Sequence, residues 1–172
     1  MKKIGASAVA SGILCGIWTY VAIRLSITNP DLFAPWLGFV GTTSFFVAGA
    51  NSSALVRSSV SNVVGVIIGC VILALGSLKP DGILFAAIVT GFFTFVICYL
   101  VHIDLLKYST CTFMGGFSAF ATGGNWKMMI LCLLIGNLVG YLCVKFGDVI
   151  HKATYKKDFN QEEWTVLKLF DD

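Results

Sequence analysis

Two asparagines in apolar surroundings are the residues of this sequence best suited to bind a solute. Asn62 lies in the apolar stretch 54–76, and Asn137 lies in the apolar stretch 128–147. An amide side chain offers two N–H donors and an oxygen with two lone pairs, so each can bind a small polar molecule. The same groups can instead hydrogen-bond across helices and hold a bundle together, at ~0.6 kcal/mol each on average. The residue types alone leave both roles open.

Hydroxyl and aromatic side chains gather in two short stretches, 38–49 and 112–124, that are rich in Gly, Ser and Thr. They supply further candidates for a pore lining or solute site: Ser44, Ser118, Thr42, Thr43, Phe46 and Phe120. Asn51 and Asn125 follow these stretches and belong to the same candidate set, although Asn also commonly ends helices. The glycines here either pack a helix crossing or expose carbonyl oxygens to a narrow pore.

The sequence shows none of the residue combinations that usually perform catalysis. It contains no buried carboxylate pair, no Ser/His/Asp set and no phosphate-binding loop, and the six cysteines form no CxxC pair. We therefore expect no enzyme, no catalytic residue, no metal site and no cofactor. The ionisable groups near the apolar runs, Arg57, His102 and Asp104, fall at predicted helix ends. A pump coupled to protons or sodium ions would more often carry an acidic residue deep within a membrane span. The absence of such a residue favours passive permeation, or coupling through neutral oxygens.

The elements that must position these residues are membrane helices. Hydrophobic residues make up 57% of the 172-residue chain and charged residues only 12%, against roughly 25% charged in a soluble domain. The sequence predicts an all-α integral membrane protein with six transmembrane helices, over 5–27, 34–50, 54–76, 83–103, 108–124 and 128–147. The second and fifth are short and Gly-rich, and they can be tilted or interrupted where neighbouring helices shield them from lipid.

An internal repeat organises these helices. Shifting the sequence by about 75 positions aligns its two halves, with these matches: 16–21 with 91–96, 39–51 with 113–125, and 62–65 with 137–140. Three spans return the chain to the opposite side of the membrane, so the second copy must be inserted upside down. Inverted repeats of this kind are common in transporters and channels, although the association is with the fold and simple structural bundles share it.

Small residues four apart mark the faces where helices are expected to touch. The pairs are Gly12 and Gly16, Ala87 and Gly91, Gly65 and Gly69, and Gly136 and Gly140. We expect these residues to serve packing.

Charge placement orients the bundle. With the N-terminus in the cytoplasm, nine of the twelve Lys and Arg residues fall on the cytoplasmic side, and Arg24, Lys79 and Lys127 fall outside. This asymmetry fits the positive-inside rule, which predicts cytoplasmic N- and C-termini.

The domain organisation is a membrane domain over 1–150, with repeat one at 5–76 and repeat two at 83–147, and a cytoplasmic tail over 151–172. The tail is polar, and either a short helix on the membrane or a neighbouring subunit, or an irregular extension, is compatible with its composition.

Three segments carry a family resemblance: 12–22, 38–49, and 113–127 with its Gly-Asn-Trp-Lys turn. They resemble the uncharacterised bacterial inner-membrane family known as domain of unknown function 1097, over most of 5–147. The resemblance implies a multi-pass protein of the bacterial cytoplasmic membrane and no substrate. Relatives can carry Asp in place of Asn125, which argues against a strict amide role there.

Two functions remain after these observations. The favoured one is a channel or facilitator for a small neutral polar solute, such as a urea-like amide, ammonia, or a short alcohol or aldehyde. The partners expected for it are the lipid bilayer, the solute and further copies of the chain in a homo-oligomer, but no nucleic acid. The alternative is a structural or regulatory membrane subunit that recruits a partner through its C-terminal tail.

Overall fold

A computed structural model describes the backbone of residues 3–168 and the side-chain environments of residues 4–154. The described chain is helical throughout. Its elements, in order, are α1 (Lys3–Thr28), α2 (Pro35–Val47), α3 (Ser52–Gly76), α4 (Ile83–Tyr99), the 3-10 turns η1 (Leu100–His102) and η2 (Asp104–Leu106), α5 (Ser109–Ala121) and α6 (Trp126–Lys168). The prediction of an all-α protein is confirmed.

Four helices in the described part of the chain are long and apolar enough to cross a bilayer: Ile4–Thr28, Ser52–Gly76, Ile83–His102 and Trp126–Thr154. A bilayer core of about 30 Å needs about 20 helical residues. At about 1.5 Å per residue, the 13-residue helices α2 and α5 reach only about 20 Å. Of the six predicted membrane helices, four are thus long enough to cross a bilayer, and α2 and α5, which were expected to be short, are too short to do so.

The two short helices end where the backbone turns sharply. Gly49 and Ala50 follow α2 with φ of +105° and +54°, and Gly123 and Gly124 follow α5 with φ of +62° and +86°. Glycine adopts these left-handed conformations freely, whereas alanine does so at a cost of about 1–2 kcal/mol. The sequence therefore terminates each short helix and redirects the chain into a long one.

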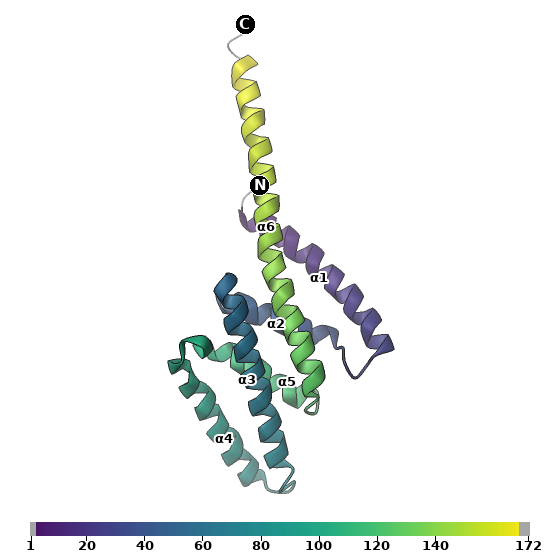
Figure 1. Ribbon diagram of the computed structural model, residues 1–172, viewed down its shortest axis with the longest axis vertical. Helices are drawn as coiled ribbons and strands as arrows, with labels where there is room; N and C mark the ends of the chain where they lie inside the picture. Colours follow the sequence, from purple (N-terminus) through teal and green to yellow (C-terminus); the bar gives the residue numbers. More distant parts are fainter. Residues whose placement is uncertain (1–2, 169–172) are drawn as a thin grey trace.

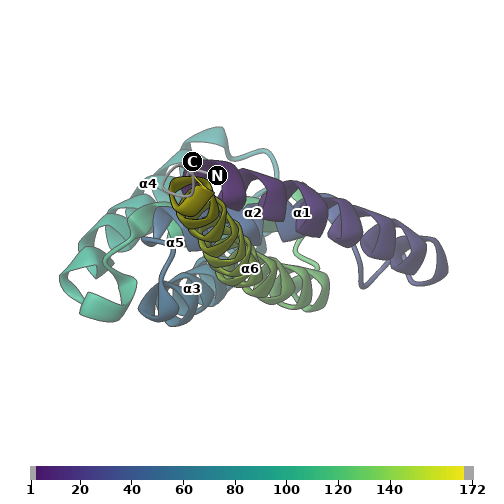
Figure 2. The same cartoon turned by 90° about the horizontal axis from the view of Figure 1, so that it is seen from above.

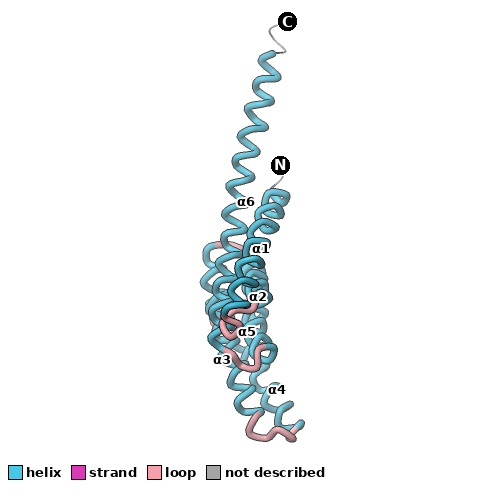
Figure 3. Tube along the Cα trace, turned by 90° about the vertical axis from the view of Figure 1, so that its right-hand side faces the viewer, coloured by secondary structure: helices cyan, strands magenta, loops and turns pink. Residues whose placement is uncertain are grey.

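The long helices run in two opposite directions. In Figure 1, α1 and α3 run downward, α4 and α6 run upward, and α2 and α5 lie crosswise between them. The helices α1 and α4 occupy opposite edges of the molecule, as the view from above also shows (Figure 2). Seen edge-on, the bundle is a narrow slab from which the end of α6 projects (Figure 3).

The short helices hold the bundle together by packing across it. The largest helix interfaces join α5 to α3, α2 to α6 and α1 to α6. Each short helix therefore rests mainly on the long helix that is distant from it in sequence. The helix α4 is the least embedded, because only 6% of its membrane-spanning window is buried inside the protein.

Glycines make these crossings close. A Cβ atom on Gly65 would overlap the carbonyl oxygen of Thr112, and one on Gly136 would overlap the carbonyl oxygen of Gly38. The expected packing role is borne out at Gly65, Gly69, Gly136 and Gly140, each of which meets a neighbouring helix.

The packing prediction is wrong within the chain for three other glycines. Gly12, Gly16 and Gly91 have no neighbouring atom within 4 Å of a Cβ position, and all three are exposed. Gly12 and Gly16 lie four residues apart on α1 and Gly91 lies on α4, and no neighbouring helix of the described chain covers any of the three.

The polar C-terminal segment continues a membrane helix. The helix α6 runs without a break for 43 residues, from Trp126 to Lys168, which is about 64 Å at the usual rise per residue. It extends well beyond the rest of the bundle (Figure 1). A separate short helix or an irregular tail after residue 150 is therefore not observed, and residues 169–172 lie outside the described chain.

Candidate functional site

The two predicted asparagines are fully buried where the short and long helices cross. Asn62 on α3 and Asn137 on α6 each have an exposed fraction of 0%. A Cβ atom on Gly115 of α5 would press on the backbone of Asn62, and one on Gly41 of α2 would lie 3.0 Å from the amide nitrogen of Asn137. The backbone of each asparagine therefore lies at a close crossing between a short helix and a long one.

Hydrogen bonds tie each asparagine to a serine. The Ser44 hydroxyl of α2 donates to Oδ1 of Asn62 at 2.9 Å. The Ser58 hydroxyl of α3 donates to Oδ1 of Asn137, whose Nδ2 donates to the Leu133 carbonyl at 2.9 Å. These hydrogen bonds connect α2 to α3 and α3 to α6, so both asparagines stabilise contacts between helices.

Three buried polar atoms have no hydrogen-bond partner within the described part of the chain. They are Nδ2 of Asn62, Oγ of Ser61 and Oγ1 of Thr112, and all three residues are 0% exposed. Leaving such a group unpaired costs about 1–3 kcal/mol. An apolar side chain of similar size at position 62 would avoid the cost of burying the unpaired Nδ2. Helix packing alone therefore does not explain why an asparagine occupies this position.

Two sulfur atoms complete the surroundings of Ser44. The Ser44 hydroxyl lies 3.1 Å from Sδ of Met114, and the Cys111 thiol donates to the Ser44 carbonyl at 3.3 Å. Both residues come from α5, so Ser44 is the point where α2, α3 and α5 meet. We call Ser44, Ser58, Ser61, Asn62, Thr112 and Asn137 the buried polar cluster.

The remaining hydroxyl candidates serve backbone contacts. Thr42 is 6% exposed and donates to the Gly136 carbonyl of α6 at 2.8 Å. Ser118 is buried but donates to Met114 one turn earlier, at 2.7 Å. Thr43 is exposed and donates to Phe39 of its own helix, at 2.8 Å.

The aromatic candidates point away from the cluster. Phe46 and Phe120 are 41% and 49% exposed on the outer surface, a position that suits contact with lipid. Phe45, beside Phe46, is instead fully buried and packs edge-on against Tyr141 at a centroid distance of 6.2 Å.

Asn51 and Asn125 are helix caps at opposite ends of the bundle. Oδ1 of Asn51 accepts from the Ala54 amide at 2.8 Å. Oδ1 of Asn125 accepts from the Met128 amide at 3.3 Å, while its Nδ2 donates to the Asp31 carbonyl at 2.7 Å. Neither lies in the buried polar cluster.

Sequence reasoning missed Ser58, Ser61 and Thr112. The signal was available for Ser58, because it precedes Asn62 by four residues and must share its helix face. Thr112 lies on α5 opposite α3, which only the crossing of these helices reveals.

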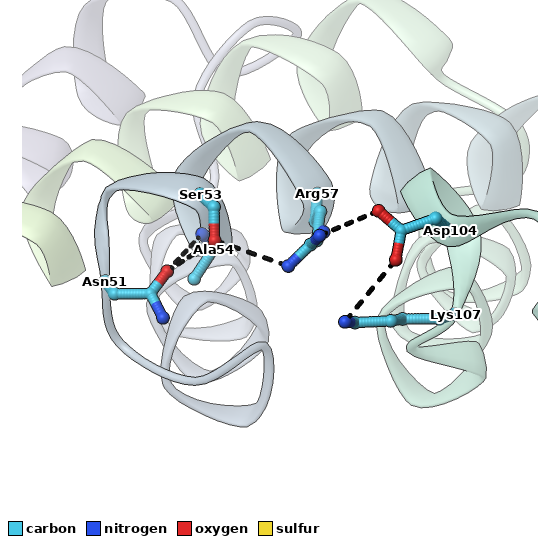
Figure 4. A network of polar contacts seen from close by, with 6 residues as sticks. All are labelled: Asn51, Ser53, Ala54, Arg57, Asp104 and Lys107. Atoms are coloured by element: carbon cyan, nitrogen blue, oxygen red, sulfur yellow. Dashed lines mark hydrogen bonds and ion pairs between the residues drawn. The ribbon is translucent and has the colours of Figure 1, made fainter.

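A charged network lies near the N-terminal end of α3 (Figure 4). The Arg57 guanidinium contacts the Asp104 carboxylate at 2.7 Å, and Lys107 lies 3.5 Å from the other carboxylate oxygen. The hydrogen bond and charge of Arg57 lower the pKa of Asp104, and Lys107 adds to the effect. The network joins α3 to η2, which confirms that these ionisable groups sit at helix ends.

The described cavities do not reach the two asparagines. One of about 310 Å³ lies between α3 and α6 near Trp126, and another of about 310 Å³ lies between α3, α4 and α5 near Phe120. A third, of about 270 Å³, lies between Asn51 and Lys145. None of these three is lined by Asn62 or Asn137.

Four membrane-length helices braced by two short ones around a neutral polar cluster define an α-helical membrane protein. The comparison with protein families identifies it further. The model for a protein family of unknown function, DUF1097, matches residues 8–148. The chain belongs to this family, which confirms the resemblance expected from its sequence.

The relatives give a location. The chain is 31% identical over 157 residues to "Inner membrane protein YcdZ" of Escherichia coli K12, covering 91% of this chain and 93% of the relative. It is 29% identical over 141 residues to the protein of the same name in Salmonella typhimurium LT2, covering 81% and 84%. It is also 29% identical over 163 residues to "Uncharacterized protein YahC" of E. coli K12, covering 92% and 99%. No solved structure matches. The chain is thus a member of a bacterial inner-membrane protein family.

Proposed function

We propose that this protein is a membrane facilitator for a small neutral polar solute, which the buried polar cluster binds on its way across. The observation that carries the proposal is the unpaired Nδ2 of Asn62, together with the unpaired hydroxyls of Ser61 and Thr112. Buried polar groups are almost always paired, so each exception calls for an explanation. A solute with its own donors and acceptors would pair these groups, and a urea-like amide, ammonia, a short alcohol or an aldehyde has that chemistry.

The charge distribution favours neutral cargo. Arg24 lies near the end of α1, Arg57 near the start of α3 and Lys127 at the start of α6. The other charged residues of α6 up to residue 154 are Lys145, Asp148 and Lys152, which follow its long apolar run. The cluster itself consists of amides and hydroxyls, which bind without a net charge. A deep acidic residue, typical of proton- or sodium-coupled transport, is absent from the described spans, so the proposal is for passive movement.

We propose in addition that the two halves of the chain form an inverted repeat, because such folds often place a site at the repeat interface. Contacts at the two crossings correspond one to one. Gly41 meets Leu133 as Gly115 meets Asn62, and Gly136 meets Gly38 as Gly65 meets Thr112. The helix directions in Figure 1 agree with a twofold axis through the crossing that relates α1–α3 to α4–α6.

The alignment of the two halves that these contacts suggest differs by about one helical turn from the alignment based on sequence similarity. The contacts relate Gly65 to Gly136 and Asn62 to Leu133, whereas sequence similarity relates Asn62 to Asn137. Under the contact register, Asn62 has an apolar counterpart. The proposed site is therefore asymmetric, with Asn62 as its principal hydrogen-bonding residue.

The crossing is closed in this conformation. Asn62 and Asn137 are fully buried, and glycine contacts bring the backbones too close for a solute to pass between them. Passage therefore requires α2 and α5 to separate from α3 and α6. A homo-oligomer is part of this proposal, as is a multi-pass topology with cytoplasmic N- and C-termini.

Solute-dependent swelling of liposomes tests the proposal. Purified protein is reconstituted, and shrinkage and swelling are followed by stopped-flow light scattering with urea, acetamide, ammonia, glycerol and short aldehydes. We expect one chemical group of solutes to enter faster than into protein-free liposomes of the same lipid. Permeability equal to protein-free liposomes for every solute would sink the proposal.

A second function is favoured by one observation, the continuous extension of α6 to Lys168 beyond the bundle. We infer that this extension could present a rigid helix to a soluble partner on the cytoplasmic side. Truncation after Asp148 should then abolish co-purification of that partner and leave solute permeability unchanged. Loss of permeability without loss of any partner would argue against this reading.

A further inference from the structure

An apolar cavity opens between α3 and α6, where the beginning of α6 lies beside the C-terminal half of α3 (Figure 1). Its volume is about 310 Å³, which is about ten times the volume of a water molecule in the liquid. Apolar cavities stay free of water, so water does not fill this one. Its lining residues are Val66, Ile67, Cys70, Val71, Ala74, Trp126 and Ile130.

The inner wall of the cavity belongs to the hydrophobic core. Val66 is 1% exposed and is part of the core cluster that also contains Met129 and Leu133. Cys70 and Ile130 pack against the same cluster. Protein interiors are close-packed and contain few voids larger than a water molecule. The cavity is therefore a place where an apolar group from outside the chain can complete the packing of the core.

The rim of the cavity is exposed at the surface of the membrane helices. Ile67 and Trp126 are each 55% exposed, and Val71 is 38% exposed. All three lie in Ser52–Gly76 and Trp126–Thr154, two helices that are long and apolar enough to cross a bilayer. In the membrane, the molecules next to this opening are lipids. An acyl chain can therefore enter the cavity sideways from the bilayer.

The size of the cavity favours an acyl chain over a helix of a second copy. A helix about 10 Å across takes up about 420 Å³ in each turn of about 5.4 Å. One turn is thus larger than the whole cavity of about 310 Å³. An acyl chain is only one methylene group wide, so a stretch of it fits along the cavity.

A cation lies next to the cavity, at the end where a lipid headgroup would be. Trp126 lines the cavity, and the ammonium of its neighbour Lys127 lies 5.7 Å from the centroid of the Trp126 ring. Lys127 makes no ion pair with the described residues. Tryptophan and lysine at the end of an apolar run are typical of the level at which a membrane helix meets the headgroups. A phospholipid with a chain in the cavity can therefore bring its phosphate to Lys127.

We propose that the cavity between α3 and α6 binds one acyl chain of a phospholipid, with the Lys127 ammonium on the phosphate of the same molecule. The lipid comes from the leaflet that meets α6 at Trp126, and its chain completes the core beside Val66. This site is separate from the buried polar cluster and does not depend on the proposed transport function.

Native mass spectrometry of the full-length protein tests the place of the acyl chain. Detergent-solubilised protein is titrated with long-chain phosphatidylglycerol, and the retained lipid is counted. Ala74→Phe places a ring at the cavity wall, and by displacing part of the chain it should lower retention about tenfold. Ala87→Phe is the matched control, because Ala87 is exposed on α4 and lines none of the three described cavities. It should behave as wild type.

The headgroup contact has its own pair of variants. Lys127→Gln should lower retention about threefold, as expected for one exposed charge contact. Lys145→Gln, far along α6 and outside this cavity, is the matched control and should retain the lipid as wild type does. Circular dichroism melting checks that every variant is folded.

Fluorescence quenching locates the chain without relying on Ala74→Phe. Phosphatidylglycerol with bromine atoms on its acyl chains is added to the protein at near-equimolar ratio. It should quench the part of the fluorescence that wild type has and Trp126→Phe lacks. Short-chain phosphatidylglycerol should be retained poorly, and glycerol phosphate, which has the headgroup chemistry but no chain, should not displace the lipid.

Four outcomes would overturn the proposal. The first is equal retention in folded Ala74→Phe and Ala87→Phe. The second is the absence of Trp126 quenching at near-equimolar lipid. The third is equal retention of short-chain and long-chain lipid, or displacement by glycerol phosphate, either of which would mean that only the headgroup binds. The fourth is a dimer that retains no lipid, which would assign the cavity to a side chain of a second copy.

Discussion

Replacing Gly65 by alanine should separate α3 from α5. A Cβ atom there would overlap the Thr112 carbonyl oxygen and lie 2.9 Å from both the Thr112 carbonyl carbon and the Gly116 amide nitrogen, where ordinary contact begins at 3.4 Å. All these neighbours are backbone atoms, so no side chain can move aside. The helices must shift apart by at least half an ångström, and by more to clear the oxygen.

The cost of this shift should be large for a single methyl group. Overpacking a well-packed interface costs about 1–3 kcal/mol, and occasionally more. Because both partners at Gly65 are backbone, we expect the upper part of that range, a loss of about 3 kcal/mol in the free energy of unfolding. The lost contacts lie along the α3–α5 interface, one of the largest in the protein.

The exposed glycines supply matched controls for the same chemical change. Gly12→Ala and Gly91→Ala add a methyl group where no atom lies within 4 Å. They should leave the stability unchanged or raise it by up to about 1 kcal/mol, because alanine favours helix more than glycine does. All three variants lie in apolar helices, so differences in helix propensity largely cancel between them.

Unfolding of the purified protein in mixed micelles, with increasing sodium dodecyl sulfate and circular dichroism as the readout, measures these differences. Gly65→Ala should unfold at a clearly lower detergent fraction than the wild type, and the controls should not. If Gly65→Ala were within about 0.5 kcal/mol of wild type, or if Gly12→Ala were equally destabilised, the crossing described here would be wrong.

Three further predictions concern polar contacts. Arg57 lowers the pKa of Asp104, so the pair stabilises the folded state above the unfolded-state pKa of about 3.9 and loses this effect as the pH falls through the lowered folded-state value. The stability difference between wild type and Asp104→Asn should therefore be present in melts at neutral pH and shrink as the melts are made more acid than about pH 3.9. Asn125→Asp should retain the helix cap but lose the bond to Asp31, and should melt between wild type and Asn125→Leu. Thr42→Val should destabilise by about 1 kcal/mol in the same micelle titration, whereas Thr42→Ser should not.

Much of the fold could be predicted from the sequence, because apolar runs and turn residues are local signals. The turns at Pro30 and Pro80 lie where α1 and α3 have ended. The length of α6 could not be predicted in this way. Its C-terminal part lacks the apolar pattern that marks a membrane span, so that pattern could not indicate a helix there. Residues such as Lys, Glu and Gln nevertheless favour helix in water.

Part of the buried polar cluster could be anticipated from the sequence. The burial of Asn62 and Asn137 followed from their apolar surroundings, but their partners depended on which helices cross. Glycine spacing identifies a helix surface that permits close approach, but it does not identify the helix that approaches. The predicted packing role was therefore right for Gly65, and wrong within the chain for Gly12.

The measurement that tests the central claim most directly is the solute permeability of Asn62→Leu in liposomes, set beside its stability in the same detergent. Leucine has a similar size and removes the unpaired Nδ2. If Asn62 exists to bind a solute, permeability should fall towards that of protein-free liposomes while the free energy of unfolding stays within about 1 kcal/mol of wild type. Unchanged permeability with a clear loss of stability would contradict the account and leave Asn62 as a structural contact between α2 and α3.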